Sequence, residues 1–129
     1  MGEAVVDASA LVDLLLNNDR GEAVQRRIGG LGLHAPAHVD AEIVSALGRL
    51  HRAGDVEAVA GEAMLIRLNA APIQRHPVNR LLVGAWARRH QLRLVDALYV
   101  ELAVSRGLLL ITTDRRLSPV PSVEVVVAV

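Results

Sequence analysis

QLRLVDALYVELAVSRGLLLITTDRR, residues 91–116, is the stretch that decides the fold. Written as a helix, its first half places Asp96 in the middle of an apolar face that consists of Tyr99, Val100, Ala103 and Val104. After a turn at Gly107, the apolar run Leu108–Ile111 is typical of a strand buried on both faces, and Asp114 follows just past its end. Ligands of open α/β sheets bind at the carboxyl ends of strands, so this stretch predicts a site near two carboxylates.

Outward from this stretch, short apolar runs and helical periods alternate along the chain. Besides 108–111, the predicted strands are 4–6, 31–35, 73–75 and 123–127. The predicted helices are 10–16, 21–28, 38–52, 56–68, 79–89 and the one that begins at 95. Ser9 is expected to cap the first of these helices and Asp55 the fourth. The alternation predicts one α/β domain over residues 1–129, with a mainly parallel central sheet flanked by helices.

The composition excludes several kinds of site. The 129 residues contain no Cys and no Lys, and all 14 cations are Arg. A thiolate metal site, a P-loop and Schiff-base chemistry are therefore excluded. The chain has one Trp, one Tyr and no Phe, so it lacks the aromatic side chains on which bases usually stack. Arginine side chains and a metal ion would have to bind any nucleic acid. We expect a cytoplasmic protein without a membrane partner, because neither a signal peptide nor an apolar run of ~20 residues is present.

Four carboxylates stand where a charge is costly. Asp7 and Asp114 end two apolar strands that should be neighbours, Asp96 faces inward, and Glu42 borders the apolar stripe of helix 38–52. Each has a structural alternative, as a helix or turn cap for the three Asp and as a surface acid for Glu42. If they converge, two like charges ~4 Å apart repel by roughly 4 kcal/mol, so a cation is required. Oxygen ligands suit Mg²⁺ or Mn²⁺, and such a site suits phosphodiester hydrolysis.

Other polar residues are weaker candidates. Those that could position a substrate or a water are Ser9, Thr112, Arg80, Arg89 and Arg115. For Ser9 the N-cap role is the better interpretation, and the arginines have an alternative as plain surface charges. Three other acids are expected on solvated faces, namely Asp13, Asp40 and Glu101. The five His do not form an H-E-x-x-H motif, so a zinc site is not predicted.

The four acids and their neighbours resemble PIN-domain ribonucleases, and in particular the VapC toxins of toxin–antitoxin pairs. The blocks that carry this resemblance are VVDASA at 5–10, DAEI at 40–43, DALYV at 96–100 and TTD at 112–114. Arg80, Trp86 and Arg89 are also similar to the segment before the third acid in many VapC chains, and Gln91 stands where Asn is common. The order and spacing of the four blocks are much more specific than any one of them.

The resemblance implies a PIN-like three-layer sandwich and an endoribonuclease that hydrolyses RNA with Mg²⁺, for which Mn²⁺ can substitute. It implies that the catalytic and metal-binding residues are Asp7, Glu42, Asp96 and Asp114. It also implies a cognate VapB-type antitoxin, a homodimer and a toxin–antitoxin hetero-oligomer. An apolar strip of Leu98 and Leu102 is expected to be exposed and would suit an interface.

Two other functional classes share some of these features. Phosphatases and phospho-acceptor domains also place Asp at strand ends, but they need a D-x-D motif or a Lys. Here Asp7 is followed by Ala8 and Ser9, and the chain has no Lys. The second alternative is a catalytically degenerate PIN-like domain kept for partner binding, and the presence of all four acids argues against it. The sequence does not name the RNA that is cut, nor does it decide between one metal ion and two.

Overall fold

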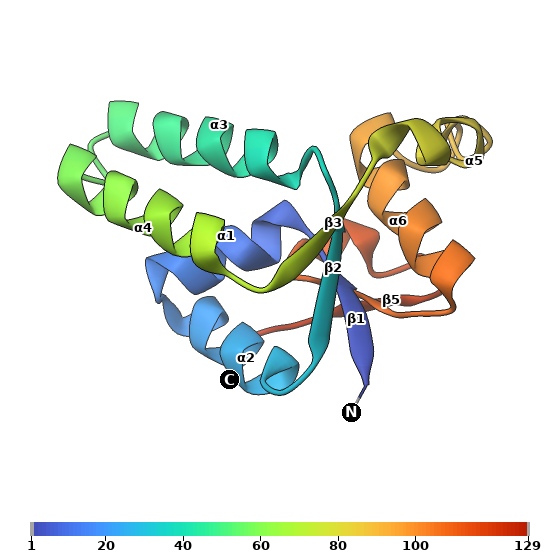
Figure 1. Cartoon of the computed structure of the whole chain (residues 1–129), viewed down its shortest axis with the longest axis horizontal. Helices are drawn as coiled ribbons and strands as arrows, with labels where there is room; N and C mark the ends of the chain where they lie inside the picture. The colour runs from blue at the N-terminus through green and yellow to red at the C-terminus, as the bar shows by residue number, and fades with distance from the viewer. Residues whose placement is uncertain (1, 129) are drawn as a thin grey trace.

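The computed structural model describes residues 2–128 as a three-layer α/β sandwich (Figure 1). Its five strands form one sheet in the order β3-β2-β1-β4-β5, and the four pairings between neighbours are all parallel. The strands are β1 (Glu3–Val6), β2 (Gly32–Pro36), β3 (Ile73–His76), β4 (Leu110–Thr112) and β5 (Val123–Val125). The predicted α/β fold with a parallel sheet is therefore confirmed.

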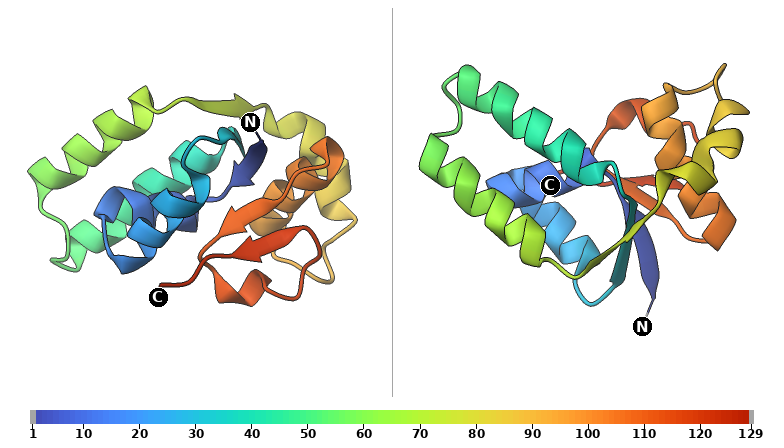
Figure 2. Two further views of the ribbon diagram at one scale, coloured as in Figure 1. Left: turned by 90° about the horizontal axis from the view of Figure 1, so that it is seen from below. Right: turned by 45° about the horizontal axis from the view of Figure 1, so that its top comes forward.

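Helices cover both faces of this sheet. They are α1 (Ala8–Leu16), α2 (Asp19–Ile28), α3 (Val39–Arg52), α4 (Ala58–Ala70), α5 (Leu82–Trp86) and α6 (Leu94–Arg106), with short 3-10 helices η1 (Val78–Leu81) and η2 (Arg115–Leu117). Helices α1 and α2 lie on one side, whereas α5 and α6 lie on the other (Figure 1). Helices α3 and α4 form an antiparallel pair that extends away from the strands (Figure 2). None of the described helices is long and apolar enough to cross a membrane.

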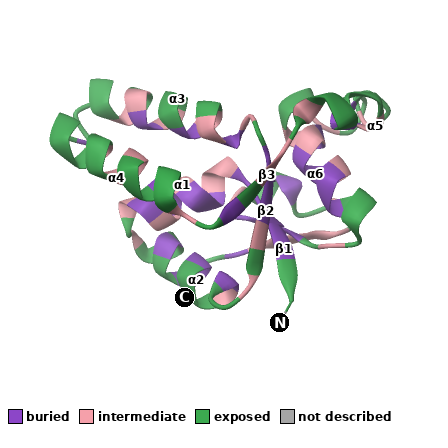
Figure 3. Ribbon diagram, viewed as in Figure 1, coloured by how far each residue is buried: buried purple, intermediate pink, exposed green. Residues whose placement is uncertain are grey.

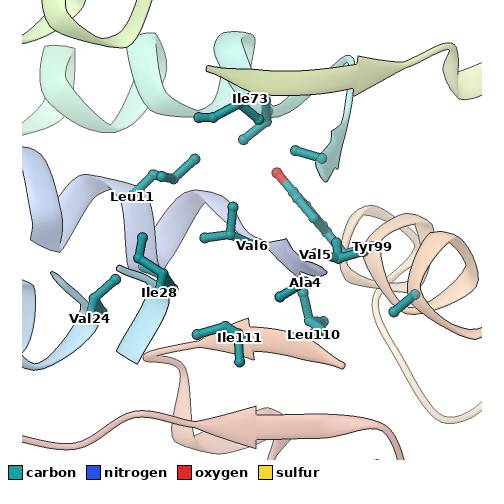
Figure 4. Close-up of a cluster of buried hydrophobic side chains, with 14 of the residues drawn as sticks. Ala4, Val5, Val6, Leu11, Val24, Ile28, Ile73, Tyr99, Leu110 and Ile111 are labelled. Carbon is teal, nitrogen blue, oxygen red and sulfur yellow. The ribbon is translucent and has the colours of Figure 1, made fainter. Parts of the chain in front are cut away.

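The core is centred on β1 and β4. Val5 and Val6 in β1 and Leu110 and Ile111 in β4 are fully buried. Figure 4 shows them between the apolar side chains of α1 and α2 and the ring of Tyr99 from α6. Each side chain of this size stabilises the fold by roughly 1.5–3 kcal/mol when it leaves water. Burial therefore holds most firmly the two strands whose ends carry Asp7 and Asp114, whereas α4 is largely exposed (Figure 3).

Two of the predicted caps are wrong. The first helix begins at Ala8, and its N-cap is Asp7, whose side chain accepts a hydrogen bond from the amide of Ala10. An aspartate that directly ends a strand can cap the next helix without an intervening loop, so Ser9 lies inside the helix. The fourth helix begins at Ala58, and Asp55 does not cap it, because the chain is still extended at Glu57.

Several predicted boundaries also differ from the structure. The fourth strand is Leu110–Thr112, so it begins two residues later than expected, and Leu109 is exposed. Residues 79–89 do not form one helix. They divide into η1, the five-residue α5, which contains Gly84, and turns.

The expected exposed strip on α6 does not exist. Leu102 is buried against the sheet and Leu98 packs partly against the core. Val104, which was expected on the buried face, is instead 46% exposed. The buried face of α6 includes Ala97 and Leu102. It is therefore rotated about the helix axis relative to the face that the sequence predicts. Leu98 and Leu102 therefore do not provide an interface.

Glycine at position 21 is required by the contact between α1 and α2. A Cβ atom added to Gly21 would lie 2.0 Å from the backbone oxygen of Asp13. The atoms that the Cβ would meet belong to the backbone of α1, so no side-chain rotation can relieve the clash. The close approach of the two helices therefore depends on the absence of a side chain here.

We predict that Gly21→Ala lowers the free energy of unfolding by roughly 2 kcal/mol or more, because the helices must separate to admit the methyl group. Gly48→Ala in α3 is the matched control, since its added Cβ meets only the flexible end of Arg52 at 3.5 Å. That change should stabilise by about 0.5–1 kcal/mol through helix propensity. Urea unfolding of both variants measures the difference, and equal stabilities would contradict the proposed clash.

Candidate active site

Four elements bring the four predicted carboxylates to one cavity. Asp7 follows β1 and Asp114 follows β4, and because these strands pair in parallel their carboxyl ends lie at the same edge of the sheet. Asp96 lies in the first turn of α6 and Glu42 in the first turn of α3. All four line a cavity of about 300 Å³, here called the acid pocket.

Asp7 is the most buried of these acids, with 6% of its surface exposed. One carboxylate oxygen accepts hydrogen bonds from the Ser9 hydroxyl (2.8 Å) and the Ala10 amide (3.0 Å). The other accepts a hydrogen bond from Thr112 in the neighbouring strand. Burial raises the pKa of Asp7 from 3.8 to about 6, and these hydrogen bonds oppose only part of that rise. Asp7 is thus a fixed carboxylate whose charge is poorly compensated.

Glu42 is positioned by an aromatic neighbour from α6. The hydroxyl of Tyr99 donates a hydrogen bond to Glu42 Oε1. Burial, followed by the nearby Glu42, raises the pKa of Tyr99 far above its ordinary value, so the phenol stays protonated and acts only as a donor. His38 packs on the Tyr99 ring with a centroid distance of 4.8 Å. These contacts orient the Glu42 carboxylate and leave Tyr99 unsuited to be a base.

Asp96 and Asp114 are each paired with an arginine at the rim of the acid pocket. Arg93 Nε lies 3.1 Å from Asp96 Oδ2, and an Arg116 nitrogen lies 2.6 Å from Asp114 Oδ2. The hydrogen bonds from Arg116 are the main reason that the pKa of Asp114 is lowered. Both arginine side chains are about two-thirds exposed, at 65% and 68%. Ion pairs this exposed contribute little to stability, so a stronger ligand can displace them.

The lining of the acid pocket fits a hard divalent cation. Among residues 2–128, no three acidic or histidine side chains are close enough to share one ion in their present rotamers. The donor set is nevertheless all oxygen, which suits Mg²⁺ or Mn²⁺. If every acid is ionised, the lining carries five negative and three positive charges, a net charge of minus two. The acids are Asp7, Asp13, Glu42, Asp96 and Asp114, and the cations are Arg49, Arg93 and Arg116. Turning Arg93 and Arg116 outward would free the carboxylates of Asp96 and Asp114.

Asp13 contradicts the prediction of a solvated acid. It is 7% exposed and lines the acid pocket. Its carboxylate accepts hydrogen bonds from Asn18 (2.8 Å) and Thr113 (2.7 Å) and lies 3.3 Å from an Arg20 nitrogen. These partners satisfy both oxygens, so Asp13 ties α1 to the loop after β4. Its position four residues after Ser9, on the same helix face, is the sequence signal that was missed.

The other two acids expected on solvated faces form ion pairs. Asp40 accepts two hydrogen bonds from Arg75, at 2.8 and 2.9 Å, and Glu101 accepts one from Arg88 at 3.1 Å. Only 23% of the Glu101 side chain is exposed, because the carboxylate lies against Gly84. Glu101 is therefore a packed residue that connects α6 to α5.

The predicted substrate-positioning residues divide into three groups. Ser9 lines the acid pocket, and Thr112 is fully buried and donates to Asp7. Arg115 lines a neighbouring cavity with Thr113. The structure does not bring Arg80 or Arg89 into the lining of the acid pocket; Arg89 instead lies over the Trp86 ring at 5.0 Å.

Arginines that the sequence did not single out line the acid pocket in their place. They are Arg49 and Arg93, and they are joined by Arg116, for which the sequence already indicated phosphate positioning as one of a cluster with Arg80, Arg88, Arg89 and Arg115. The signal for Arg49 is its place seven residues, or two helical turns, after Glu42 on the same face of α3.

Comparison with known proteins identifies the family. The PIN domain model matches residues 4–122. Ribonuclease VapC3 of Mycobacterium tuberculosis is 54% identical over 117 residues, which cover 90% of this chain and 85% of that protein. The chain belongs to the PIN-domain family, among its VapC ribonuclease toxins. The acid pocket is thus the candidate active site of a VapC protein.

Other VapC relatives agree with this identification. Ribonuclease VapC9 of Mycobacterium tuberculosis is 40% identical over 114 residues, covering 88% of this chain and 87% of that protein. A chain of a toxin–antitoxin complex from Klebsiella pneumoniae has the same fold, with a TM-score of 0.72 over 98% of this VapC chain and 100% of that one. Its identity is 16%, so that likeness concerns the fold alone.

The raised pKa of Asp7 predicts a pH-dependent stability of the metal-free protein. Between about pH 4 and pH 6 the folded state holds a proton that the unfolded state releases, so this group lowers stability as pH rises. Asp7→Asn keeps the helix cap and removes the charge. In EDTA near pH 7, the variant should exceed wild type by roughly 2–3 kcal/mol, and the difference should vanish near pH 4.

Thermal melts of the two proteins in EDTA across this pH range measure the effect. Asp55→Asn changes an exposed acid outside the acid pocket and should leave the pH profile unaltered. An Asp7→Asn protein that is less stable than wild type near pH 7 would show that the charge of Asp7 is already compensated in the fold.

Proposed function

We propose that this VapC ribonuclease hydrolyses RNA phosphodiester bonds with a divalent cation, Mg²⁺ or in its place Mn²⁺, held by Asp7, Glu42, Asp96 and Asp114. The observation that carries the proposal is that these carboxylates reach one cavity from four separate elements. Their excess negative charge and the uncompensated burial of Asp7 both call for a cation. The activity of the VapC relatives, which are ribonucleases by name, supports the reaction type.

Each side chain has a distinct part in the proposed reaction. The cation, when bound, supplies an activated water and neutralises charge on the phosphate. Asp7 provides a carboxylate whose direction is set by Thr112, Ser9 and the Ala10 amide. Further carboxylate oxygens would come from Asp96, Asp114 and Glu42. Each would either bind the cation directly or accept a hydrogen bond from a water on the cation.

The rim of the acid pocket suits the RNA backbone. Arg49, Arg93 and Arg116 line it, and guanidiniums form strong, bidentate hydrogen bonds with phosphate oxygens. Arg93 and Arg116 are mostly exposed, so their heads can reach a strand that lies across the opening. We assign them, rather than Arg80 and Arg89, to phosphate positioning. Because RNA is the substrate, the proposed compartment is the cytoplasm.

We expect Asp7→Ala and Asp96→Ala to reduce cleavage of single-stranded RNA by at least about 100-fold, because each removes a carboxylate from the acid pocket. EDTA should abolish cleavage by wild type, and Mg²⁺ or Mn²⁺ should restore it. Asp55→Ala is the control for loss of an exposed acid outside the acid pocket. Full activity of wild type in EDTA would refute the requirement for a metal ion. A titration that shows no saturable binding of Mn²⁺ would favour a degenerate, partner-binding domain.

The proposed partners are a VapB-type antitoxin and a second copy of the chain, as a homodimer within a toxin–antitoxin hetero-oligomer. A structurally similar chain from Klebsiella pneumoniae was crystallised as a toxin–antitoxin complex, which supports the antitoxin. The acid pocket supplies a physical basis for inhibition. Its surplus of carboxylates would attract a guanidinium from another chain, as it already attracts Arg93 and Arg116.

If the antitoxin places a basic side chain in the acid pocket, the toxin–antitoxin complex should bind Mn²⁺ at least about tenfold more weakly than the free toxin, because guanidinium and metal compete for the same oxygens. Calorimetric titration of both forms with Mn²⁺ measures this. The Asp96→Ala toxin should show a smaller difference between its free and bound forms. Equal affinities of the wild-type forms would mean that the antitoxin inhibits elsewhere.

A further inference from the structure

A second cavity of about 300 Å³ lies beside the acid pocket and takes no part in the chemistry described so far. Its walls are apolar, with Leu92 and Val120 and the prolines on either side of Val120. Its polar groups are the guanidiniums of Arg88 and Arg116 and the amide of Gln91. The volume is at the lower end of the range for small-molecule sites. This cavity is called the base cavity below.

Arg116 connects the base cavity to the acid pocket, because its side chain lines both. The guanidinium of Arg116 pairs with Asp114 at 2.6 Å. A molecule in the base cavity would therefore lie within one arginine side chain of the carboxylates. For an RNA strand at the acid pocket, the nearest groups that can enter are those of the adjoining nucleotide.

We propose that the base cavity receives one unpaired nucleobase of the RNA, next to the phosphate that is cut at the acid pocket. The inference rests on the proposed function. A base needs apolar surface for its two faces and hydrogen-bonding groups for its edge. Leu92, Val120 and the prolines supply the first, and Gln91 with the two guanidiniums supplies the second. Guanidinium planes also stack on bases, which matters in a chain with one Trp and no Phe.

The polar groups of the lining favour a nucleotide over other occupants. Two arginines and one glutamine line the base cavity, and the described residues that line it include no carboxylate, although Arg88 is paired with Glu101 and Arg116 with Asp114 just outside it. The ion pair of the exposed Arg116 is weak, so a strand of RNA can recruit this guanidinium. A single base fits where a base pair does not, so the occupant is single-stranded or splayed out of a helix.

The base cavity is also built from fixed parts. Arg88 is held by Glu101 at 3.1 Å, and Glu101 in turn lies against Gly84. The amide of Val120 donates to the carbonyl of Leu117 at 3.0 Å, which closes a turn that contains Pro119 and is followed by Pro121. Proline fixes φ within that turn and just after it. Little ordering is therefore required when a base enters.

The test compares removal of the base with removal of the base cavity. First, wild type cuts a randomised pool of single-stranded RNA, and a short oligonucleotide is synthesised around a mapped cut. Versions with an abasic ribose at each flanking position are then assayed for kcat/KM. In wild type, one position next to the cut should show a loss of about tenfold or more, the size expected for a bound base.

Gln91→Ala removes the edge contact from an exposed turn, and Val120→Trp fills the base cavity. Both should cut the intact oligonucleotide more slowly, and the abasic penalty at that position should fall below about twofold, because the contact is already lost. Gln74→Ala, an exposed glutamine in β3 outside the base cavity, should keep the wild-type penalty. Melting temperatures identify a variant that is merely unfolded, and Gln91→Ala alone then suffices.

An unchanged tenfold penalty in both variants would overturn the proposal, as would the absence of any sensitive position in wild type. A cavity that receives an antitoxin side chain instead would give that same unchanged profile. Failure of the proposed function is distinguishable, because wild type would then cut no RNA or would cut it in EDTA. If cleavage of RNA requires a metal ion but the abasic penalty is the same in the variants as in wild type, only the proposed role of the base cavity is refuted.

Discussion

The structure depends on the parallel pairing of β1 with β4, and on the hydrogen bond that crosses it from Thr112 to Asp7. The pairing places the ends of both strands at one edge of the sheet, and the bond fixes a carboxylate there. Since Asp7 also caps α1, the strand, the helix and the acid are joined at one residue. The apolar packing of both strands holds this arrangement, so the energy that keeps a costly charge in place comes from the core.

The acids are stabilised in two different ways. Asp7 and Glu42 are held by neutral hydroxyl and amide donors, which orient a carboxylate without cancelling its charge. Asp96 and Asp114 are held by exposed arginines, which cancel charge but are weakly bound. The first arrangement gives a site its geometry. Under the proposed function, the second would let the arginines exchange carboxylate for phosphate when RNA and a cation bind, so one set of residues would serve the empty and the loaded state.

The fold, and the convergence of four acids on one cavity, could be predicted from the sequence because both depend on strong local signals. An apolar run followed by an aspartate identifies a strand end regardless of what surrounds it. Asp13, Arg49 and the Glu101–Arg88 pair could not be predicted with the same ease, since their roles depend on which elements become neighbours. The cap at Asp7 was predicted only as an alternative to a place in the site, whereas in the structure one carboxylate both caps α1 and lines the acid pocket. Leu102 was expected to be exposed because a small rotation of α6 is invisible in the periodicity.

The contrast between the core strands and the helical pair α3–α4 has a consequence for local stability. The amides of β1 and β4 are enclosed by fully buried side chains, and such amides exchange with solvent only when the whole domain unfolds. Helix α4 has one buried side chain, Leu68, and α3 has three. We expect the outer turns of this pair to open more often than the strands. Glu42 lies at the start of α3 between Val39 and Ile43, which are fully buried, so these turns can open to a strand of RNA or a partner while the acid pocket keeps its geometry.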